Sequence, residues 1–112
     1  MTSTTHDIPA DVLTLLALPA LAALTPDQER GAVCVWGRSE APLTTMTAIN
    51  LGEQQTDGRH WFPRACRPHT GAHAYRALMD HAPQCRPCIQ DAIACPTGIA
   101  LRRLMRAARR TV

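Results

Sequence analysis

The densest group of metal-binding side chains lies in the second half of the 112-residue chain and has the pattern His-x3-Cys-x2-Cys-x6-Cys. We call this group site 2; it consists of His81, Cys85, Cys88 and Cys95. Structural zinc takes four thiolate or imidazole ligands in a tetrahedron, and a Cys-x2-Cys turn places two thiolates on the same side of a tight knuckle. The spacing predicts one zinc ion at site 2; the alternative is a cluster of reduced cysteines without metal.

A second group, site 1, consists of Cys34, Cys66 and His69. Cys34 opens the sequence Cys-Val-Trp-Gly, which resembles a zinc knuckle without its second cysteine, and Cys66 and His69 form a Cys-x2-His pair at an expected helix start. A knuckle, a hairpin and two ligands at a helix start is the order of a treble-clef zinc finger. The fourth position is open to His60, to His73, to water or to no ligand. Site 1 thus allows for a second zinc ion, whereas Cys34 could instead be a buried core thiol.

The cysteine count and the lack of an export signal predict thiols that stay reduced. The chain has five cysteines, an odd number. The apolar stretch at 12–24 follows two aspartates, not the basic residues of a secretory signal, and it is too short to span a bilayer. We therefore expect a cytoplasmic protein without membrane attachment or disulfides, whose cysteines bind metal.

From about residue 31 to 110, the chain resembles a group of small cysteine- and histidine-rich, zinc-finger-like proteins of high-GC actinobacteria. The resemblance rests on Gly-Ala-Val-Cys-Val-Trp at 31–36, Trp-Phe-Pro-Arg-Ala-Cys-Arg-Pro at 61–68, Asp-His-Ala-Pro at 80–83 and Cys-x2-Cys at 85–88. Such proteins often read Cys-Val-Trp-Cys and Cys-Arg-Pro-Cys, where this chain has Gly37 and His69 at the last positions. The resemblance implies metal binding and no particular activity.

Two other chemistries remain open. Cys66 and the three cysteines of site 2 have the pattern Cys-x18-Cys-x2-Cys-x6-Cys, which resembles the layout of the WhiB-like transcription factors and implies a [4Fe–4S] cluster. The Gly-Val-Trp-Gly-Gly turn of those factors is absent, and the last spacing is one residue longer than theirs. An open site 1 could also activate water in a zinc-dependent enzyme. No acidic residue close to Cys66 or His69 in the sequence offers itself as a base, so the sequence favours a non-catalytic role.

The elements that must position these ligands begin with a helical segment at 1–30, ahead of a zinc-binding domain at 31–112. We expect an amphipathic helix from residue 8 to 24, kinked or divided at Pro19 because proline lacks a donor and crowds the preceding turn. A short helix should follow, with Thr25 as its N-cap, Pro at its first position and Gly31 at its end.

The remaining pattern predicts an α+β fold. The β-prone segments and an intervening Asp-Gly turn indicate a small antiparallel hairpin or a three-stranded sheet. Two to three C-terminal helices, pinned by zinc, should follow, one capped by Thr70 and running to about residue 82. The β-prone segments are 32–36, 43–51 and 59–62, the turn is at 57–58, and the last helix is expected at about 96–110.

Charge is unevenly distributed along the chain. Residues 1–63 hold three arginines and seven acids, residues 64–112 hold nine arginines and two acids, and the net charge is +3. If the last helix buries its apolar stripe, its arginines face outward, where guanidinium groups match phosphate oxygens. We therefore expect a small zinc-binding regulatory or adaptor protein that binds nucleic acid through a row of arginines on this helix. The row could instead face an acidic protein partner, the acidic first half of the chain, or solvent. The row consists of Arg102, Arg103, Arg106, Arg109 and Arg110.

Overall fold

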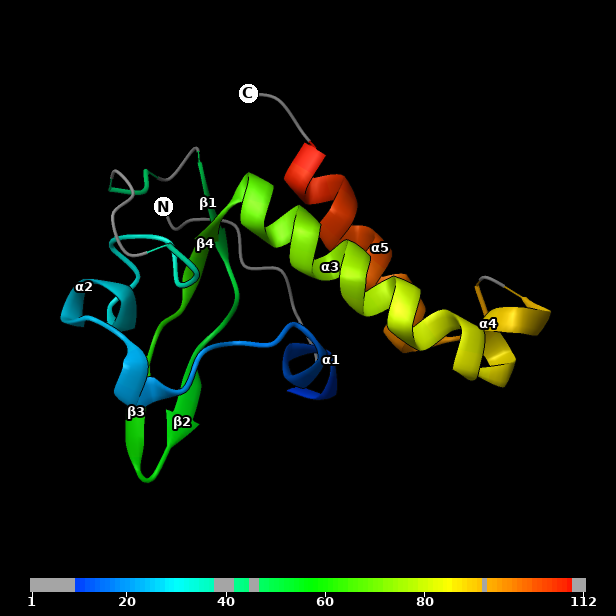
Figure 1. The fold of residues 1–112 in the computed structure, drawn as a ribbon, viewed down its shortest axis with the longest axis horizontal. Coiled ribbons are helices and arrows are strands. Elements are labelled where there is room, and N and C mark those ends of the chain that lie inside the picture. The colour runs from blue at the N-terminus through cyan, green and yellow to red at the C-terminus, as the bar shows by residue number, and fades with distance from the viewer. Residues whose placement is uncertain (1–9, 38–41, 45–46, 92, 110–112) are drawn as a thin grey trace.

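The computed structural model describes residues 10–37, 42–44, 47–91 and 93–109. It shows an α+β fold in which two long helices lie side by side, with a β-ribbon at one end and a short helix at the other (Figure 1). The helices are α1 (Ala10–Leu15), α2 (Pro26–Glu29), α3 (Arg67–His81), α4 (Arg86–Gln90) and α5 (Pro96–Arg109), with 3₁₀ turns η1 (Leu21–Ala23) and η2 (Ala82–Gln84). The strands are β1 (Ala48–Asn50), β2 (Gln54–Thr56), β3 (Arg59–Trp61) and β4 (Arg64–Cys66).

The N-terminal helical segment is divided, as Pro19 predicts. Helix α1 ends at Leu15, and Ala17 then takes a φ of 60°, in the left-handed region that ends helices. After an extended stretch, η1 forms a single turn at 21–23. Val12 and Leu16 are fully buried. The helical part of this segment is therefore short, and, together with Leu13, it packs three aliphatic side chains into the core.

The short helix predicted after Thr25 is confirmed. The Thr25 Oγ1 atom accepts a hydrogen bond from the Gln28 N–H at 3.2 Å, and the Gln28 side chain accepts one from the Thr25 N–H at 2.8 Å. This reciprocal pair is a capping box. The chain leaves α2 at Gly31, whose φ is 80°, and there a Cβ atom would lie 2.6 Å from the Phe62 carbonyl oxygen. Only glycine fits this exit.

The four strands form one irregular two-stranded ribbon. Strand β1 pairs antiparallel with β4, with Ala48 opposite Cys66, and β2 pairs antiparallel with β3. Between the two pairs, residues 52 and 53 lie opposite the single residue Phe62, as in a β-bulge, and Gly52 has a φ of 92°. The predicted turn at 57–58 is confirmed, since both residues have a positive φ, of 53° and 77°. The ribbon delivers Cys66 directly to the start of α3.

The predicted strand at 32–36 is not formed. The buried side-chain amide of Gln28 donates to the carbonyl oxygens of Cys34 and Val35, at 3.4 and 3.1 Å. The Gly37 N–H donates to the Cys34 carbonyl at 3.1 Å, so the chain turns back on itself. Of the second predicted strand, at 43–51, only β1 is formed, and residues 45 and 46 lie outside the described part. The segment keeps isolated backbone bonds, from the Val35 N–H to the Arg64 carbonyl of β4 at 2.8 Å and from the Leu43 N–H to the Ala32 carbonyl at 2.8 Å, while the Gln28 side chain occupies two of its carbonyls.

Helices α3 and α5 pack together as an antiparallel hairpin. They lie close together at Gly71, where a Cβ atom would lie 3.2 Å from the Cβ atom of Ala108. Leu78, Leu101 and Leu104 are buried between them and belong to one core cluster with residues of α1 and the ribbon. Among the described residues, no helix is long and apolar enough to cross a membrane.

Helix α3 begins three residues earlier than predicted. Cys66, at the end of β4, is its N-cap, and Pro68 lies in the first turn, where its missing N–H is not needed. Thr70, expected as the cap, lies inside the helix, where its hydroxyl donates to the Cys66 carbonyl at 2.8 Å. This early start places His69 in the first turn of α3, next to Cys66.

Candidate metal centres

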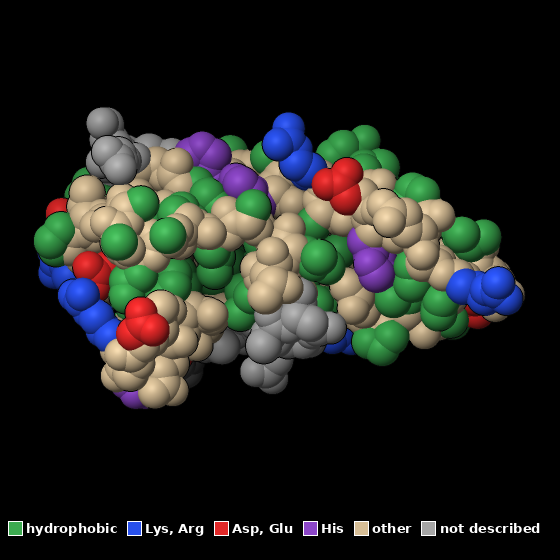
Figure 2. Space-filling view, turned by 60° about the horizontal axis from the view of Figure 1, so that its bottom comes forward, with side chains coloured by type: hydrophobic (Ala, Val, Ile, Leu, Met, Phe, Trp, Pro, Cys, Tyr) green, Lys and Arg blue, Asp and Glu red, His purple; other side chains and the backbone are tan. Residues whose placement is uncertain are grey.

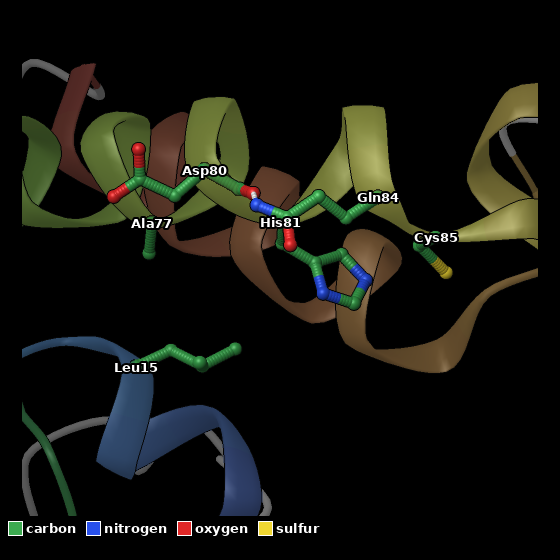
Figure 3. A pocket seen from close by; sticks show the side chains of 6 residues that line it. All are labelled: Leu15, Ala77, Asp80, His81, Gln84 and Cys85. Atoms are coloured by element: carbon green, nitrogen blue, oxygen red, sulfur yellow. Dashed lines mark hydrogen bonds between the residues drawn. The ribbon is translucent and has the colours of Figure 1, made fainter.

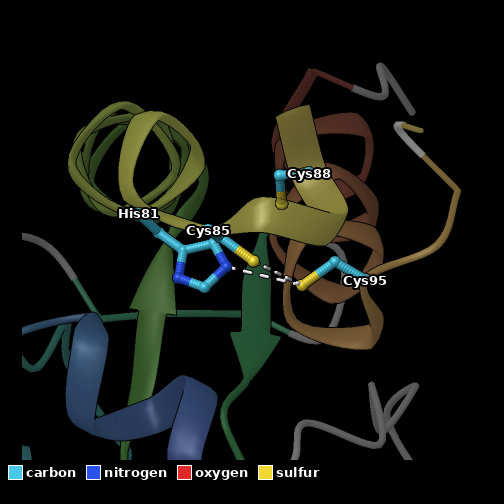
Figure 4. Close-up of side chains that lie close together, drawn as sticks. All are labelled: His81, Cys85, Cys88 and Cys95. Atoms are coloured by element: carbon cyan, nitrogen blue, oxygen red, sulfur yellow. Dashed lines mark hydrogen bonds between the residues drawn. The ribbon is translucent and has the colours of Figure 1, made fainter. Parts of the chain in front are cut away.

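Site 2 lies where α3 ends and where both α4 and α5 begin (Figure 4). His81 is the last residue of α3, Cys85 is the N-cap of α4, Cys88 is in the first turn of α4, and Cys95 directly precedes α5. The four ligand atoms all lie within 4.8 Å of one another. The structure therefore brings together all four residues that the sequence grouped, and the group could hold a metal ion.

The separations within site 2 fit a tetrahedral metal site. Zinc–sulfur bonds of about 2.3 Å and zinc–nitrogen bonds of about 2.0–2.1 Å imply edges of roughly 3.8 Å between sulfurs and roughly 3.6 Å between sulfur and nitrogen. The Cys85 and Cys95 sulfurs are 3.7 Å apart, and the His81 Nε2 atom lies 3.4 Å from the Cys95 sulfur. A disulfide would need about 2.05 Å, and all five cysteines are free thiols. The donor set is arranged for an ion and not for a covalent bridge.

Cys95 interacts with the start of α5, as its position before a helix predicts. The Gly98 N–H donates to the Cys95 sulfur at 3.5 Å. This hydrogen bond, followed by the contact with His81, lowers the pKa of the Cys95 thiol from 9.0 to about 6. Burial, followed by hydrogen bonding to Cys95, raises the pKa of the Cys88 thiol from 9.0 to about 11. In the metal-free cluster, Cys95 is therefore the thiol that most readily gives up its proton.

Site 1 assembles three ligands at the opposite end of α3. Cys34 comes from the turn that follows α2, Cys66 is the N-cap of α3, and His69 lies in the first turn of that helix. The Nδ1 atom of His69 lies 3.3 Å from the Cys34 sulfur and 3.2 Å from the Cys66 sulfur. Cys34 is fully buried, while the other two side chains are half-buried. These three residues also could hold a metal ion.

The two histidines considered as a fourth ligand have other partners. His60, on β3, is exposed and forms an ion pair with Glu53. His73 stacks on Trp36, with ring centroids 3.9 Å apart and planes 9° from parallel. Burial lowers the pKa of the His73 imidazole below its usual 6.5, so the ring is held in its neutral form at neutral pH. Among the described residues, the group at site 1 contains three ligands and neither of these rings.

The same short sequence motif at a helix start supplies two ligands to each site. Residues 66–69 read Cys-Arg-Pro-His and residues 85–88 read Cys-Arg-Pro-Cys. In both cases the first cysteine is a helix N-cap with extended backbone, and the proline lies in the first turn. N-cap and third helical position are neighbours across that turn, so the two ligands face the same point. The repeated motif predicts a helix start at both places; sequence reasoning used only the Cys-x2-Cys spacing and so missed α4.

The four-cysteine layout considered for an iron–sulfur cluster is not assembled. Cys66 caps the N-terminus of α3, whereas Cys85 follows its C-terminus, and the helix between them has 15 residues. At 1.5 Å per residue, such a helix is roughly 22 Å long. Cys66 therefore cannot join the cysteines of site 2 around one cluster, and it lies with site 1 instead.

A pocket of about 480 Å³ lies beside site 2, between α1 and the end of α3 (Figure 3). Its wall includes the ring of His81 and the side chain of Cys85, with Leu15 of α1 opposite them. Asp80 also lines it, but its carboxylate points away from His81 and Cys85. A carboxylate that activates a metal-bound substrate must lie within hydrogen-bond reach of the reacting atoms. Among the residues that line this pocket, the one carboxylate therefore does not face the two ligands of site 2.

Comparisons of the chain with models of known protein families, with curated proteins and with solved structures find no match. The fold and the two sites define the class on their own: an α+β protein in which one helix connects two Cys/His groups that could each hold a metal ion.

Proposed function

We propose that this chain is a small zinc-binding adaptor or regulatory protein in which zinc at site 2 joins the ends of three helices. The observation that carries the proposal is the convergence of three thiols and one imidazole within 4.8 Å of one another, with Cys95 at 3.4 Å from His81 and 3.7 Å from Cys85, close to the edge lengths of a zinc tetrahedron. Tetrahedral sites of sulfur and nitrogen donors suit zinc. With four protein ligands such a site is closed and structural, so zinc here supports the fold and performs no catalysis.

The surface that this fold presents to a partner is the outer side of α5. Arg103, Arg106 and Arg109 are exposed, while Leu101 and Leu104 on the inner side are buried. Arg102 is half-buried, and Arg110 lies outside the described residues. Spacings of three residues place the exposed arginines on one side of the helix. The amphipathic division expected from the sequence is thus present in α5.

The exposed arginines of α5 are not neutralised by the acidic first half of the chain, as far as the structure describes it. The ion pairs in that part of the molecule join Arg30 to Asp27, Arg59 to Glu29 and His60 to Glu53. On the face that Figure 2 shows, basic side chains are scattered and form no continuous patch, and acidic side chains lie near some of them. The three exposed guanidinium groups of Arg103, Arg106 and Arg109 on one helix favour an anionic partner, and nucleic acid matches them best because arginine binds phosphate in a bidentate manner.

Metal analysis of protein purified without chelator tests the zinc proposal. We expect at least one zinc ion per chain, and Cys88→Ser should remove the ion at site 2. Iron in place of zinc, or a metal-free protein that folds normally, would contradict the assignment.

Titration against duplex DNA and structured RNA at two salt concentrations tests the partner. Arg103→Gln/Arg106→Gln should weaken binding and reduce the slope of log affinity against log salt by about 2, one for each lost phosphate contact. The matched control is Arg30→Gln/Arg59→Gln, which lowers the net charge from +3 to +1, as the α5 variant does, but removes arginines that lie outside α5. The control should keep most of the binding. Equal losses in both variants, or no binding at low salt, would rule out α5 as a nucleic-acid contact and favour a protein partner.

A further inference from the structure

We infer that site 1 is a metal site whose fourth position, beside Gly37, is filled by none of the residues that the structure describes, and that a low-molecular-weight thiol binds there. The inference concerns site 1 alone and does not depend on the role proposed for site 2. It rests on three features: the likeness between the donor sets of the two sites, the course of the turn at 34–37, and the access of solvent to that turn.

The donor set of site 1 equals that of site 2 with one thiolate missing. Each site has a Cys-Arg-Pro-ligand helix start, completed by ligands from outside that helix. Site 2 gains two such ligands and reaches three sulfurs and one imidazole, whereas site 1 gains only Cys34 and reaches two sulfurs and one imidazole. Two thiolates make a bound metal ion a soft acceptor, which prefers a further sulfur donor. An added thiolate would give site 1 the same ligand set as site 2.

The turn that carries Cys34 leaves a place for the missing ligand. The Gly37 N–H donates to the Cys34 carbonyl at 3.1 Å, so residues 34–37 form a tight turn with position 37 beside position 34. In a Cys-x2-Cys knuckle, the residue at this position supplies the second thiolate. Glycine supplies no side chain at all. The knuckle is therefore formed, but with one of its two ligands absent.

This turn is held firmly against the ligand face of α3. Trp36 stacks on His73, one helical turn after His69, and its indole N–H donates to the Ala17 carbonyl at 3.2 Å. On its other side, the Gln28 amide holds the Cys34 carbonyl. Residues before and after the turn's centre are thus fixed, so position 37 stays beside the metal ligands and does not swing away. Gly37 itself is half-buried, so a small molecule from solvent can reach it.

Binding of a thiol at this position would be a ligand substitution in which a solvent water leaves the metal as the sulfur binds. The thiol loses its proton to solvent and its sulfur binds the metal as a thiolate, with no change of oxidation state. Zinc with two thiolates and a neutral imidazole carries no net charge, so a third thiolate brings the site to the charge of −1 that a filled site 2 has. The pair of sites then differs only in whether the third sulfur belongs to the chain.

Cobalt substitution measures the number of sulfur ligands directly, because thiolate-to-cobalt charge-transfer absorbance increases with the number of cobalt–sulfur bonds. With both sites loaded, the protein has five such bonds, one for each cysteine. Addition of 2-mercaptoethanol should raise the absorbance by about a fifth, to that of six bonds, without loss of cobalt. Gly37→Cys should show this higher absorbance with no thiol added and should not respond to thiol.

Two further variants test whether the rise in absorbance comes from a thiol bound at site 1. Gln55→Cys adds a sixth cysteine on the exposed side of β2, away from both sites, and should leave both the spectrum and its thiol response as in the unaltered protein. Cys66→Ser should abolish the thiol response while the three cobalt–sulfur bonds of site 2 remain, which separates a failure at site 1 from a failure at site 2. A spectrum that ignores thiol in the unaltered protein, or a Gly37→Cys protein without the extra cobalt–sulfur bond, would overturn the inference.

Discussion

Removing one ligand of site 2 should unfold one end of the molecule and leave the rest intact. The segment from 82 to 94 joins α3 to α5, and none of its described residues is buried. Its two large aliphatic side chains, Ile89 and Ile93, are 68% and 77% exposed. Burial of apolar surface, the main force that holds segments of a protein in place, is therefore nearly absent here. We predict that Cys88→Ser, which leaves three ligands, releases this segment from the helix hairpin.

The magnitude follows from the loop that the metal closes. When His81 and Cys95 bind one ion, they close a loop of 15 residues. A cross-link over such a loop lowers the conformational entropy of the unfolded chain and so stabilises the folded state by about 3 kcal/mol. Cys88→Ser should lower the free energy of unfolding by up to about this amount. For a chain of this size, the loss corresponds to a fall in melting temperature of roughly 10–20 °C. The packing of Leu78 against Leu101 and Leu104 does not involve the metal, so the hairpin itself should persist.

Hydrogen exchange resolves this prediction by segment. In Cys88→Ser, the amides of α4, such as Ile89 N–H bonded to the Cys85 carbonyl, should lose protection, while those in the middle of α3 and of α5 keep it. The control is Cys66→Ser, at the other end of α3, which should leave α4 protected. If α4 stays protected in Cys88→Ser, or if both variants unfold globally, then the metal does not act as a local staple and the reasoning is wrong.

Two predictions concern the turn before site 1. Gly31→Ala should destabilise the fold by about 2 kcal/mol or more in urea unfolding, because its φ is 80° and the new methyl would lie 2.6 Å from the Phe62 carbonyl oxygen; an unchanged midpoint would contradict this. Gln28→Ala should cost about 2–3 kcal/mol, because it removes half of the capping box, leaves the Val35 carbonyl without the Gln28 donor and leaves the Cys34 carbonyl with only its bond from the Gly37 N–H. Competition with a zinc chelator should show weaker binding at site 1 only, and equal weakening at both sites would refute a local role for this side chain.

The elements that the sequence predicts correctly are those specified by neighbouring residues. The capping box at Thr25 and Gln28, the turn at 57–58 and the helix over 96–109 depend on residues a few positions apart. The ligand set of site 2 spans only 15 residues and is likewise local. Such features can be derived from short-range stereochemistry; the structure agrees with the first three and brings the four residues of site 2 together, while metal binding there stays a prediction.

The elements that the sequence mispredicts depend on long-range partners. The β-prone segment at 32–36 fails to form a strand because the Gln28 amide occupies its carbonyls. The second role of Gln28 could not be derived from its position in the capping box. Likewise, the exclusion of His73 from site 1 follows from its stacking on Trp36, which depends on how the N-terminal turn packs on α3. The repeated Cys-Arg-Pro motif is different, since it was present in the sequence and would have located α4.

Binding of zinc at both sites would change the net charge of the chain, and so its attraction for nucleic acid, only slightly. Zinc replaces three protons at site 2, a change of −1, and two protons at site 1, which leaves the charge unchanged; a fully loaded chain therefore moves from +3 only to +2. Metal loading cannot by itself create or abolish an attraction for phosphate. Nor does it hold the basic row in place, because Arg103, Arg106 and Arg109 lie on the part of α5 that Leu101 and Leu104 anchor in the core. If binding of nucleic acid depends on zinc, then the partner must also contact α4, a helix with no buried residue.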